Sequence, residues 1–483
     1  MLIDYLVDNG MNILHKIKQI IPIKVFKALQ PAYHFCLSGL AALWYGFPSE
    51  KLIVIGVTGT TGKTTSLYII AKTLASAGYK VGFTSTAIFN DGRKEWLNDK
   101  KMTMPGRFFT QKIMSQMVKN GCQYAIIETT SEGIRQFRHR FINYDTLIFT
   151  GLYQEHIESH GSYENYKKAK GQLFKHLRRG KTKYVNNEKK VCQSETGLKK
   201  IDLNCVKKAI IANGDDEEAK YFLDFWAEKK IIYAQGNGVK NFQGEIIKYN
   251  QVKFNRDGLS FTIAGENIKL RLMGRFNATN AMTAVCVGLN ESVDIKRIKA
   301  GLESIKGIPG RLELINEGQS FIVVVDYAFE PRALAKLYET VESIADNSGK
   351  KEPELEDRKI IHVLGSAGGG RDVSRRPRLG KIAGAKADYV IITNEDPYDD
   401  DPQTIINQVA EGAIEADKKE NENLFKILDR RQAIRKALAL AADNDIVLIT
   451  GKGSEQAICL AGGKKVAWDD RVVVRSELKK RLK

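Results

Sequence analysis

The chain has 483 residues, which is too long for one ordinary hydrophobic core and predicts two large domains with a smaller piece. Its composition, 43% hydrophobic and 27% charged residues, is typical of a soluble globular protein, so disorder is not the default expectation. The formal net charge of +18 favours anionic partners such as nucleotides or phosphorylated substrates, but no dense Lys/Arg tract with interleaved aromatics points to nucleic acid.

The six cysteines are scattered without C-x-x-C spacing, so the sequence predicts neither a zinc ribbon nor a disulfide framework. This cysteine pattern fits a reducing compartment. The first residues also lack the basic-then-apolar order of a signal peptide. We therefore expect a cytoplasmic protein, and a monomer.

An apolar segment lies near the N-terminus. Residues 32–47, AYHFCLSGLAALWYGF, contain no Lys, Arg, Asp or Glu and follow Lys18, Lys24 and Lys27. A membrane-spanning helix needs about 20 apolar residues, so this segment is short for one. We expect a helix packed on the next domain. The alternative is an interfacial anchor that gives peripheral membrane contact through residues 20–47.

From Lys51 onward, apolar strands alternate with amphipathic helices, a pattern that predicts parallel sheets with helices on both faces. The expected strands include KLIVIGVTG, YAIIET, DTLIFTG and TKYVNN, and TTSLYIIAKTLASAG is expected to be a helix. Residues 241–272 alternate over short runs with turn signals, which predicts antiparallel strands appended to this sheet. Another helix is expected near Asn277 to Leu289.

The Gly-Ile-Pro-Gly segment at 307–310 predicts a hinge, because the α/β alternation restarts after it with FIVVVDYA, KIIHVLGSAGGG, ADYVIITN and DIVLITGKG. The charged run from Glu352 to Lys359 predicts a solvated loop. The fold class is therefore α/β. The expected parts are a short apolar helical segment (1–48), a central P-loop ATP-binding domain with a parallel sheet (49–308) and a C-terminal, Rossmann-like doubly wound domain (309–483).

The segment GVTGTTGKTT, residues 56–65, lies between a predicted strand and a predicted helix, the context that a phosphate-binding loop requires. Its glycines fall at 56, 59 and 62, so the strict G-x-x-x-x-G-K-[ST] spacing is not met. Glycines let backbone amides close around phosphate oxygens, and the lysine adds a positive charge. The sequence therefore predicts nucleotide binding through Gly59, Thr60, Thr61, Gly62, Lys63, Thr64 and Thr65.

This loop resembles that of the Mur ligases, the amide-forming enzymes of cell-wall precursor assembly. The resemblance continues to the C-terminus through IIETTSEG, FTGLYQEHIESHGSYENYKKAK, GRFNATN, IPGRLE, VVDYAFEP, GGGRDVSRRP, TNEDPYDDDP and GKGSEQ. The MurE type, which adds a diamino acid to a muramoyl dipeptide, is the most similar subgroup. Folylpolyglutamate synthases share the architecture, but their loop continues Gly-Lys-Gly-Ser, whereas this loop continues Gly-Lys-Thr-Thr.

The resemblance implies ATP and two Mg²⁺ ions as cofactors. Thr64, Glu128 and His156 would be metal ligands, since hydroxyl and carboxylate oxygens suit Mg²⁺. Lys170 falls at the position where Mur ligases carry a carbamylated lysine, which places an anion beside the second Mg²⁺. The catalytic residues implied are Lys63, Lys170, His156 and Glu128.

Residues on both sides of the hinge resemble those that hold the nucleotide. Asn280 resembles the adenine contact, and Arg311 and Asp326 resemble residues that reach phosphate and ribose from the second domain. Catalysis is therefore expected to require domain closure.

The resemblance also implies the substrate residues. Thr103, Ser131 and Arg138 fall where MurE-type enzymes hold the muramoyl peptide, and an arginine can clamp a carboxylate with two hydrogen bonds. The implied substrate residues of the C-terminal part are Arg371, Asp396, Tyr398, Gly451 and Glu455.

Two departures from the MurE pattern concern the substrates. The usual Asp-Asn-Pro-Arg, whose arginine pairs with a second carboxylate of the amino acid, reads Glu395-Asp396-Pro397-Tyr398 here. This favours L-lysine, ornithine or another amine without a second carboxylate, with Glu455 meeting its distal amino group. In addition, only about 50 residues precede the first strand, where the family places a UDP-binding domain of roughly a hundred.

The expected reaction begins with attack of a substrate carboxylate on the γ-phosphate of ATP, and an amine then converts the acyl phosphate into an amide. The expected product is a muramoyl peptide extended by one amino acid. The alternatives are a MurT-like or other Mur-like enzyme acting on a lipid-linked or non-muramoyl peptide, a folylpolyglutamate-synthase-like ligase, and a nucleotide-binding scaffold without catalysis. Retention of the phosphate-loop lysine and the expected metal ligands disfavours the scaffold.

Overall fold

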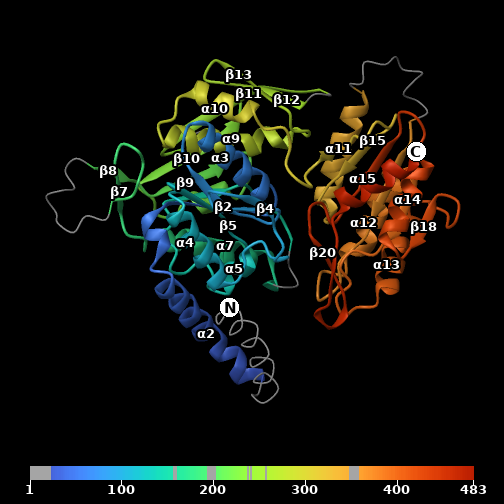
Figure 1. Cartoon of the computed structure of the whole chain (residues 1–483), viewed down its shortest axis with the longest axis horizontal. Coiled ribbons are helices and arrows are strands. Elements are labelled where there is room, and N and C mark those ends of the chain that lie inside the picture. The colour runs from blue at the N-terminus through green and yellow to red at the C-terminus, as the bar shows by residue number, and fades with distance from the viewer. Residues whose placement is uncertain are drawn as a thin grey trace.

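The computed structural model describes residues 23–155, 160–192, 203–236, 239, 242–255, 258–346 and 358–482. Its strands form two large sheets (Figure 1). We call the larger sheet and its helices the central domain, and the smaller sheet and its helices the C-terminal domain.

The sheet of the central domain has 11 strands in the order β13-β12-β11-β10-β9-β6-β1-β5-β2-β3-β4. Pairing is parallel from β2 to β11 and antiparallel at both edges. The strands are β1 (Ile53–Thr58), β2 (Val81–Thr84), β3 (Ile88–Asn90), β4 (Glu95–Leu97), β5 (Tyr124–Glu128), β6 (Thr146–Phe149), β9 (Ala209–Asn213), β10 (Lys229–Gln235), β11 (Glu245–Asn255), β12 (Gly258–Ile263) and β13 (Glu266–Leu270). The expected parallel sheet with appended antiparallel strands is confirmed, and β11 joins the two parts because its first residues pair in parallel with β10.

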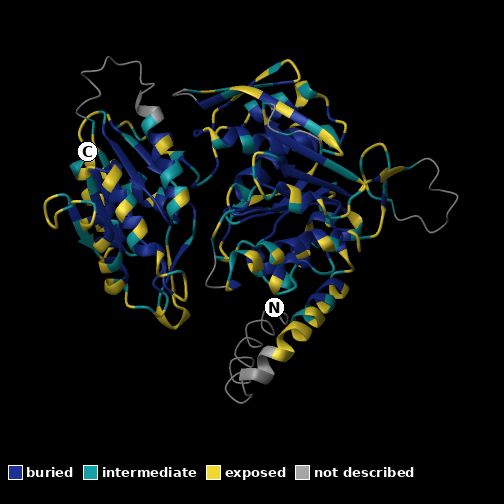
Figure 2. Ribbon diagram, turned by 180° about the vertical axis from the view of Figure 1, so that it is seen from behind, coloured by how far each residue is buried: buried dark blue, intermediate teal, exposed yellow. Residues whose placement is uncertain are grey.

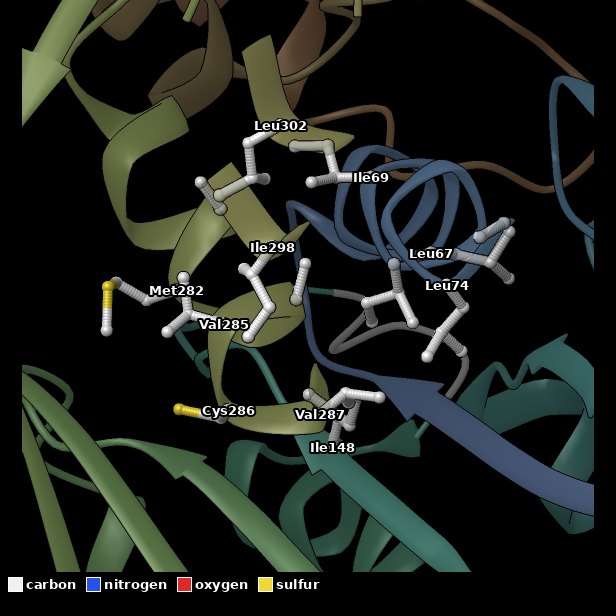
Figure 3. Close-up of a cluster of buried hydrophobic side chains, with 14 of the residues drawn as sticks. Leu67, Ile69, Leu74, Ile148, Met282, Val285, Cys286, Val287, Ile298 and Leu302 are labelled. Carbon is white, nitrogen blue, oxygen red and sulfur yellow. The ribbon is translucent and has the colours of Figure 1, made fainter. Parts of the chain in front are cut away.

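Helices cover both faces of this sheet. Alternate residues of the first strand separate the two cores: Ile53, Ile55 and Val57 face one, and Val54 faces the other. The first core is closed by α3 (Lys63–Ser76), α9 (Phe276–Asn290) and α10 (Ile295–Glu303). Figure 3 shows side chains of these three helices meeting above β6. The second core is closed by α4 (Arg107–Lys119), α5 (Ser131–Arg135), α7 (Tyr163–Leu177) and α8 (Ala219–Leu223).

The sheet of the C-terminal domain has six strands in the order β14-β15-β19-β16-β17-β18, and only β14 is antiparallel to its neighbour. Its strands are β14 (Glu313–Leu314), β15 (Ile322–Val325), β16 (Ile360–Leu364), β17 (Tyr389–Thr393), β18 (Leu424–Ile427) and β19 (Ile446–Ile449). Its helices are α11 (Pro331–Asp346), α12 (Arg375–Lys386), α13 (Pro402–Ile414), α14 (Arg430–Leu440) and α15 (Asp470–Arg481). The first three cover one face and the last two the other, which confirms the second doubly wound unit. The buried residues run along both sheets (Figure 2).

The remaining elements are short. The predicted strand TKYVNN forms β7 (Lys183–Val185), which pairs with β8 (Asn204–Val206) in a separate two-stranded sheet. A second small sheet joins β20 (Ala457–Cys459) to β21 (Lys465–Ala467), and two single turns are η1 (Pro48–Lys51) and η4 (Ala461–Gly463). Most of the charged run expected to be a loop, residues 352–357, lies outside the described residues.

Helix α2 (Ile23–Trp44) extends away from the central domain (Figures 1 and 2). Small residues form its packed face: Ser38, Ala41 and Ala42 are buried, and the Ser38 hydroxyl donates a hydrogen bond of 2.9 Å to the carbonyl oxygen of Phe137. One face of this helix therefore packs on the next domain, as expected. Among the described residues, no helix is both long enough and apolar enough to cross a membrane.

Candidate active site

A cavity of about 1380 Å³ is lined by residues of both domains. Most of the site residues predicted from the sequence, from both the central and the C-terminal domain, line this cavity. The described ones that line it are Thr60, Thr61, Gly62, Lys63, Thr64, Thr65, Thr103, Glu128, Ser131, Arg138, Asn280, Arg311, Asp326, Arg371, Asp396, Tyr398, Gly451 and Glu455. Gly59 and Lys170 lie outside the lining, and His156 lies outside the described residues.

The phosphate loop follows β1 and ends at the first turn of α3. Gly62 precedes that helix with a φ of 78°, and a Cβ there would lie 2.4 Å from Oδ1 of Asn280, so only glycine fits. The ammonium of Lys63 donates a hydrogen bond of 2.7 Å to the carbonyl oxygen of Thr60. Burial lowers the pKa of Lys63, while Glu128 and Glu330 raise it. The loop therefore brings a helix N-terminus and a partly desolvated ammonium to the cavity, a combination that binds phosphate.

Glu128 ends β5 beside this loop and is buried. Its Oε2 accepts hydrogen bonds from the Thr64 hydroxyl at 2.9 Å and from the Thr86 amide at 2.8 Å. The Thr86 hydroxyl lies 2.9 Å from Glu128 Oε1 and 2.9 Å from Thr103 Oγ1. This set of carboxylate and hydroxyl oxygens has the chemistry that Mg²⁺ prefers. Among the described residues, no group of three or more His, Cys, Asp and Glu side chains is arranged to hold a metal.

Lys170 on α7 is buried behind the phosphate loop. Its ammonium donates a hydrogen bond of 2.9 Å to the carbonyl oxygen of Gly59 and lies 4.6 Å from the centre of the Tyr166 ring. Burial, and next the charge of Lys63, hold the pKa of Lys170 well below its usual value. A lysine held this way spends more time as the neutral amine, which is the form that reacts with CO₂.

The expected nucleotide contacts come from both domains. Asn280 lies on α9 next to Gly62, and its amide donates to Oδ1 of Asn277 at 2.8 Å. Arg311 stacks on Tyr327, with 4.2 Å between the guanidinium carbon and the ring centre. Asp326 follows β15 directly and accepts from the amides of Leu312 and Ala328 at 2.7 Å each.

The residues expected to hold the carboxylate substrate lie beside Glu128. Ser131 begins α5, and its hydroxyl lies 3.1 Å from Nε2 of His160. Arg138 is not a solvated charge, because its guanidinium donates to the carbonyl oxygen of Met104 and to Oε1 of Gln136. Burial lowers the pKa of Arg138. The guanidinium is thus fixed at the cavity wall.

Acidic residues of the C-terminal domain line the opposite wall. Asp396 and Glu455 both accept hydrogen bonds from Lys452, and both also accept from Lys101 of the central domain. Glu395 is buried beside Gly451, and among the described residues its Oε2 has no hydrogen-bond partner. Burial and the neighbouring Asp396 raise the pKa of Glu395.

Two family models together match most of the chain. The Mur ligase middle domain matches residues 57–207 and 199–288, and the Mur ligase, glutamate ligase domain, matches residues 310–453. The chain belongs to the Mur ligase family. It is therefore an ATP-dependent peptide ligase by family, as the motifs indicated.

The sequences of several relatives align with most of this Mur ligase. The UDP-N-acetylmuramyl-tripeptide synthetase of Roseiflexus sp. is 34% identical over 93% of this chain and 82% of its own length. The UDP-N-acetylmuramoyl-L-alanyl-D-glutamate--2,6-diaminopimelate ligase of Geobacillus kaustophilus is 30% identical over 92% of this chain and 82% of its own. These matches confirm the predicted MurE-type resemblance.

Solved structures share the fold of this Mur ligase. A structure of UDP-N-acetylmuramoyl-L-alanyl-D-glutamate--2,6-diaminopimelate ligase has a TM-score of 0.54 at 24% identity, over 90% of this chain and 79% of that one. The Escherichia coli FolC structure in complex with ADP has a TM-score of 0.60 at 16% identity, over 92% and 93%. Both support the α/β fold class.

Three cavity or near-cavity residues of this Mur ligase were missed by the sequence analysis: Thr86, Lys101 and His160. Thr86 follows β2, whose carboxyl end is adjacent to that of β5, so strand order could have indicated it. His160 lies in the same QEHIESHG motif as His156. Lys101 gave no signal, because its partners are 295 and 354 residues away in the chain.

Proposed function

We propose that the chain joins an amino acid to the carboxylate of a muramoyl-dipeptide-type substrate through an acyl phosphate. The observation that carries this proposal is the single cavity with the phosphate loop on one wall and the acidic residues of the C-terminal domain on the other. Nucleotide, carboxylate and amine can then meet in one space, and exclusion of water from it on domain closure would protect an acyl phosphate from hydrolysis.

In the first step, a carboxylate oxygen of the substrate attacks the γ-phosphorus of ATP and ADP leaves. Lys63 is positioned to stabilise the charge of the transferred phosphoryl group, and Arg138 to orient the carboxylate. Mg²⁺ held by Thr64 and Glu128 would neutralise phosphate charge. In the second step the amine attacks the acyl carbon, its proton leaves with solvent or a base, and phosphate departs as the amide forms.

The test is ADP release by the purified chain with ATP, Mg²⁺, UDP-muramoyl dipeptide and a panel of amino acids. We expect release to require both the dipeptide and an amine, and hydroxylamine to trap the activated carboxylate as a hydroxamate. Lys63→Met should abolish release, whereas Lys51→Met, on the exposed turn before β1, should not. Release that needs neither the dipeptide nor an amine would contradict the proposal.

We further propose that α2 lies on an anionic membrane surface. Its large apolar side chains point outward along one stripe: Leu29, Tyr33, Leu40, Leu43 and Trp44 are between 38% and 66% exposed. This inverts the usual pattern, because the small residues of α2 are the buried ones. Four lysines at positions 16, 18, 24 and 27 precede the uncharged stretch, and basic residues beside an apolar helix favour anionic lipid. Peripheral binding of this kind suits a lipid-linked substrate.

Co-sedimentation with vesicles tests this contact. The chain should bind vesicles with half phosphatidylglycerol and bind phosphatidylcholine vesicles weakly. Leu43→Glu with Trp44→Glu should abolish binding, whereas Trp226→Glu, which changes an exposed tryptophan elsewhere on the central domain, should not. Dimerisation through α2 without vesicle binding, seen by sedimentation velocity, would contradict the proposal.

A further inference from the structure

Lys101 of the central domain reaches across the cavity into the C-terminal domain. It lies in the loop between β4 and α4, two residues before Thr103, and its backbone adopts a left-handed conformation with a φ of 56°. Its side chain is only 5% exposed. The ammonium donates three hydrogen bonds: to Asp396 Oδ2 at 2.7 Å, to Glu455 Oε2 at 2.5 Å and to the carbonyl oxygen of Ala457 at 2.8 Å. All three of its donors are therefore satisfied.

Lys452 holds the same acidic pair from behind. Its ammonium, fully buried, lies 2.9 Å from both oxygens of Asp396, 2.7 Å from Glu455 Oε2 and 2.7 Å from the carbonyl oxygen of Ala457. Lys452 does not line the cavity, whereas Lys101 does. Two ammonium groups thus share two carboxylates, and the cluster carries no net charge.

Three of the four oxygens of the pair accept two hydrogen bonds each, and the fourth, Glu455 Oε1, accepts one. Besides the two lysines, Asp396 Oδ1 accepts from the Cys459 amide at 2.7 Å, and Glu455 Oε1 accepts from the Tyr327 hydroxyl at 3.1 Å. Burial would lower the pKa of Lys101, but the charges of Glu455 and Asp396 outweigh it and raise that pKa. Lys101 therefore stays cationic.

We infer that Lys101 determines which amine the ligase accepts. It fills the ammonium site of the acidic pair, so the incoming amino acid has a side chain without an amino group, in place of the L-lysine or ornithine expected from the sequence. This rests on the proposed ligase function. A diamino acid would have to displace Lys101 or bring a third cation to a neutral, buried cluster, and like charges at such a site are repelled.

Removal of Lys101 should change which amino acid the pocket accepts. Lys101→Ala leaves Asp396 Oδ2, Glu455 Oε2 and the Ala457 carbonyl oxygen around an empty position, with a net charge of −1 on the cluster. These three acceptors hold the Lys101 ammonium in the wild type, so they could hold the distal ammonium of L-lysine in its place. Lys101→Met removes the charge but keeps most of the volume, so it should admit that ammonium less well.

The experiment compares L-lysine with L-norleucine, which lacks only the distal amino group. We expect wild type to favour norleucine in kcat/KM, and Lys101→Ala to raise the lysine-to-norleucine ratio at least about tenfold. Lys101→Met should raise it less. The control is Lys100→Met, because Lys100 is 42% exposed and pairs only with its neighbour Asp99 among the described ion pairs; its ratio should stay at the wild-type value. A general folding defect would lower both rates and leave the ratio unchanged.

Calorimetric titration of the two amino acids into the ADP-loaded proteins gives a second readout, because it measures binding without the ligation reaction. Lysine should bind Lys101→Ala more tightly than wild type, and norleucine should not. The inference is overturned if wild type prefers lysine over norleucine, or if Lys101→Ala changes neither the rate ratio nor lysine binding. Absence of ADP release with every amine would instead remove the proposed function, and the titration would still decide the role of Lys101.

Discussion

The hydroxyl of Thr64 donates a hydrogen bond of 2.9 Å to Oε2 of Glu128, and so joins the first turn of α3 to the end of β5. The two residues are 64 positions apart in the chain. They meet because β1 and β5 are parallel neighbours, so the loop after one strand lies beside the carboxyl end of the other. This contact brings the two expected Mg²⁺ ligands together.

Glu128→Gln should weaken Mg²⁺ binding, because an amide keeps the shape of the carboxylate but removes its charge. We expect the Mg²⁺ concentration for half-maximal ADP release to rise by about 10- to 100-fold. Thr64→Ser keeps the hydroxyl and should change this value little, whereas Thr64→Ala should raise it. A Mg²⁺ titration of the steady-state rate measures each value, and an unchanged midpoint in Glu128→Gln would remove it from the metal site.

Lys170 should carry a carbamate, because its buried amine has a lowered pKa and lies against the phosphate loop. Protein equilibrated with ¹³C-bicarbonate should give a carbamate carbon signal by NMR, and Lys170→Ala should lose both that signal and most ADP release. Lys175→Ala, at the end of the same helix, serves as the control. A wild-type spectrum without the signal would leave Lys170 as an unmodified hydrogen-bond donor to Gly59.

The sequence was sufficient for the parts of the fold and the site that depend on local pattern. The apolar run of β1, buried at every residue, and the glycines after it predicted the phosphate loop. Lys101 could not be predicted, since an isolated lysine in a polar loop has no pattern until its distant partners are known. Hydrophobicity also could not predict which face of α2 packs on the domain, because Ala41 and Ala42 are buried while the more apolar Leu43 and Trp44 are exposed. Tertiary contacts decide such cases.

Asp145 should be essential for the stability of the central domain. It is fully buried, and its two oxygens accept from Lys183 at 2.5 Å and Lys208 at 2.8 Å, while Oδ2 also accepts from the Val54 amide. Asp145→Asn would leave two buried ammonium groups without a counter-charge, and we expect a loss of about 3–5 kcal/mol in the free energy of unfolding. Urea denaturation followed by tyrosine and tryptophan fluorescence measures it.

The control for Asp145 is an exposed ion pair. Lys381 and Glu415 are 62% and 59% exposed, so Glu415→Gln should change the unfolding free energy by less than about 1 kcal/mol. A similar small change in Asp145→Asn would mean that water or a shifted lysine pKa compensates for the lost carboxylate.

Glu330 should make stability depend on pH near neutrality. It lies in the cavity wall with Oε2 unpaired, and burial, opposed by Arg375 and Lys63, raises its pKa to about 7 from 4.5. The folded state therefore keeps a proton that the unfolded state releases between these values. Its contribution to stability is fully present below pH 4.5 and is lost as pH rises through 7, by up to about 3 kcal/mol.

Glu330→Gln tests this sign directly, because glutamine mimics the protonated acid at every pH. The variant should match wild type near pH 5 and become more stable than wild type near pH 8, where the buried carboxylate is ionised. The control is Glu339→Gln, on helix α11, which begins directly after Glu330. Its unfolding free energy should differ from that of wild type by the same amount across this pH range. If Glu330→Gln also gives a constant difference from pH 5 to pH 8, Lys63 and Arg375 hold Glu330 ionised throughout, and its pKa is not raised.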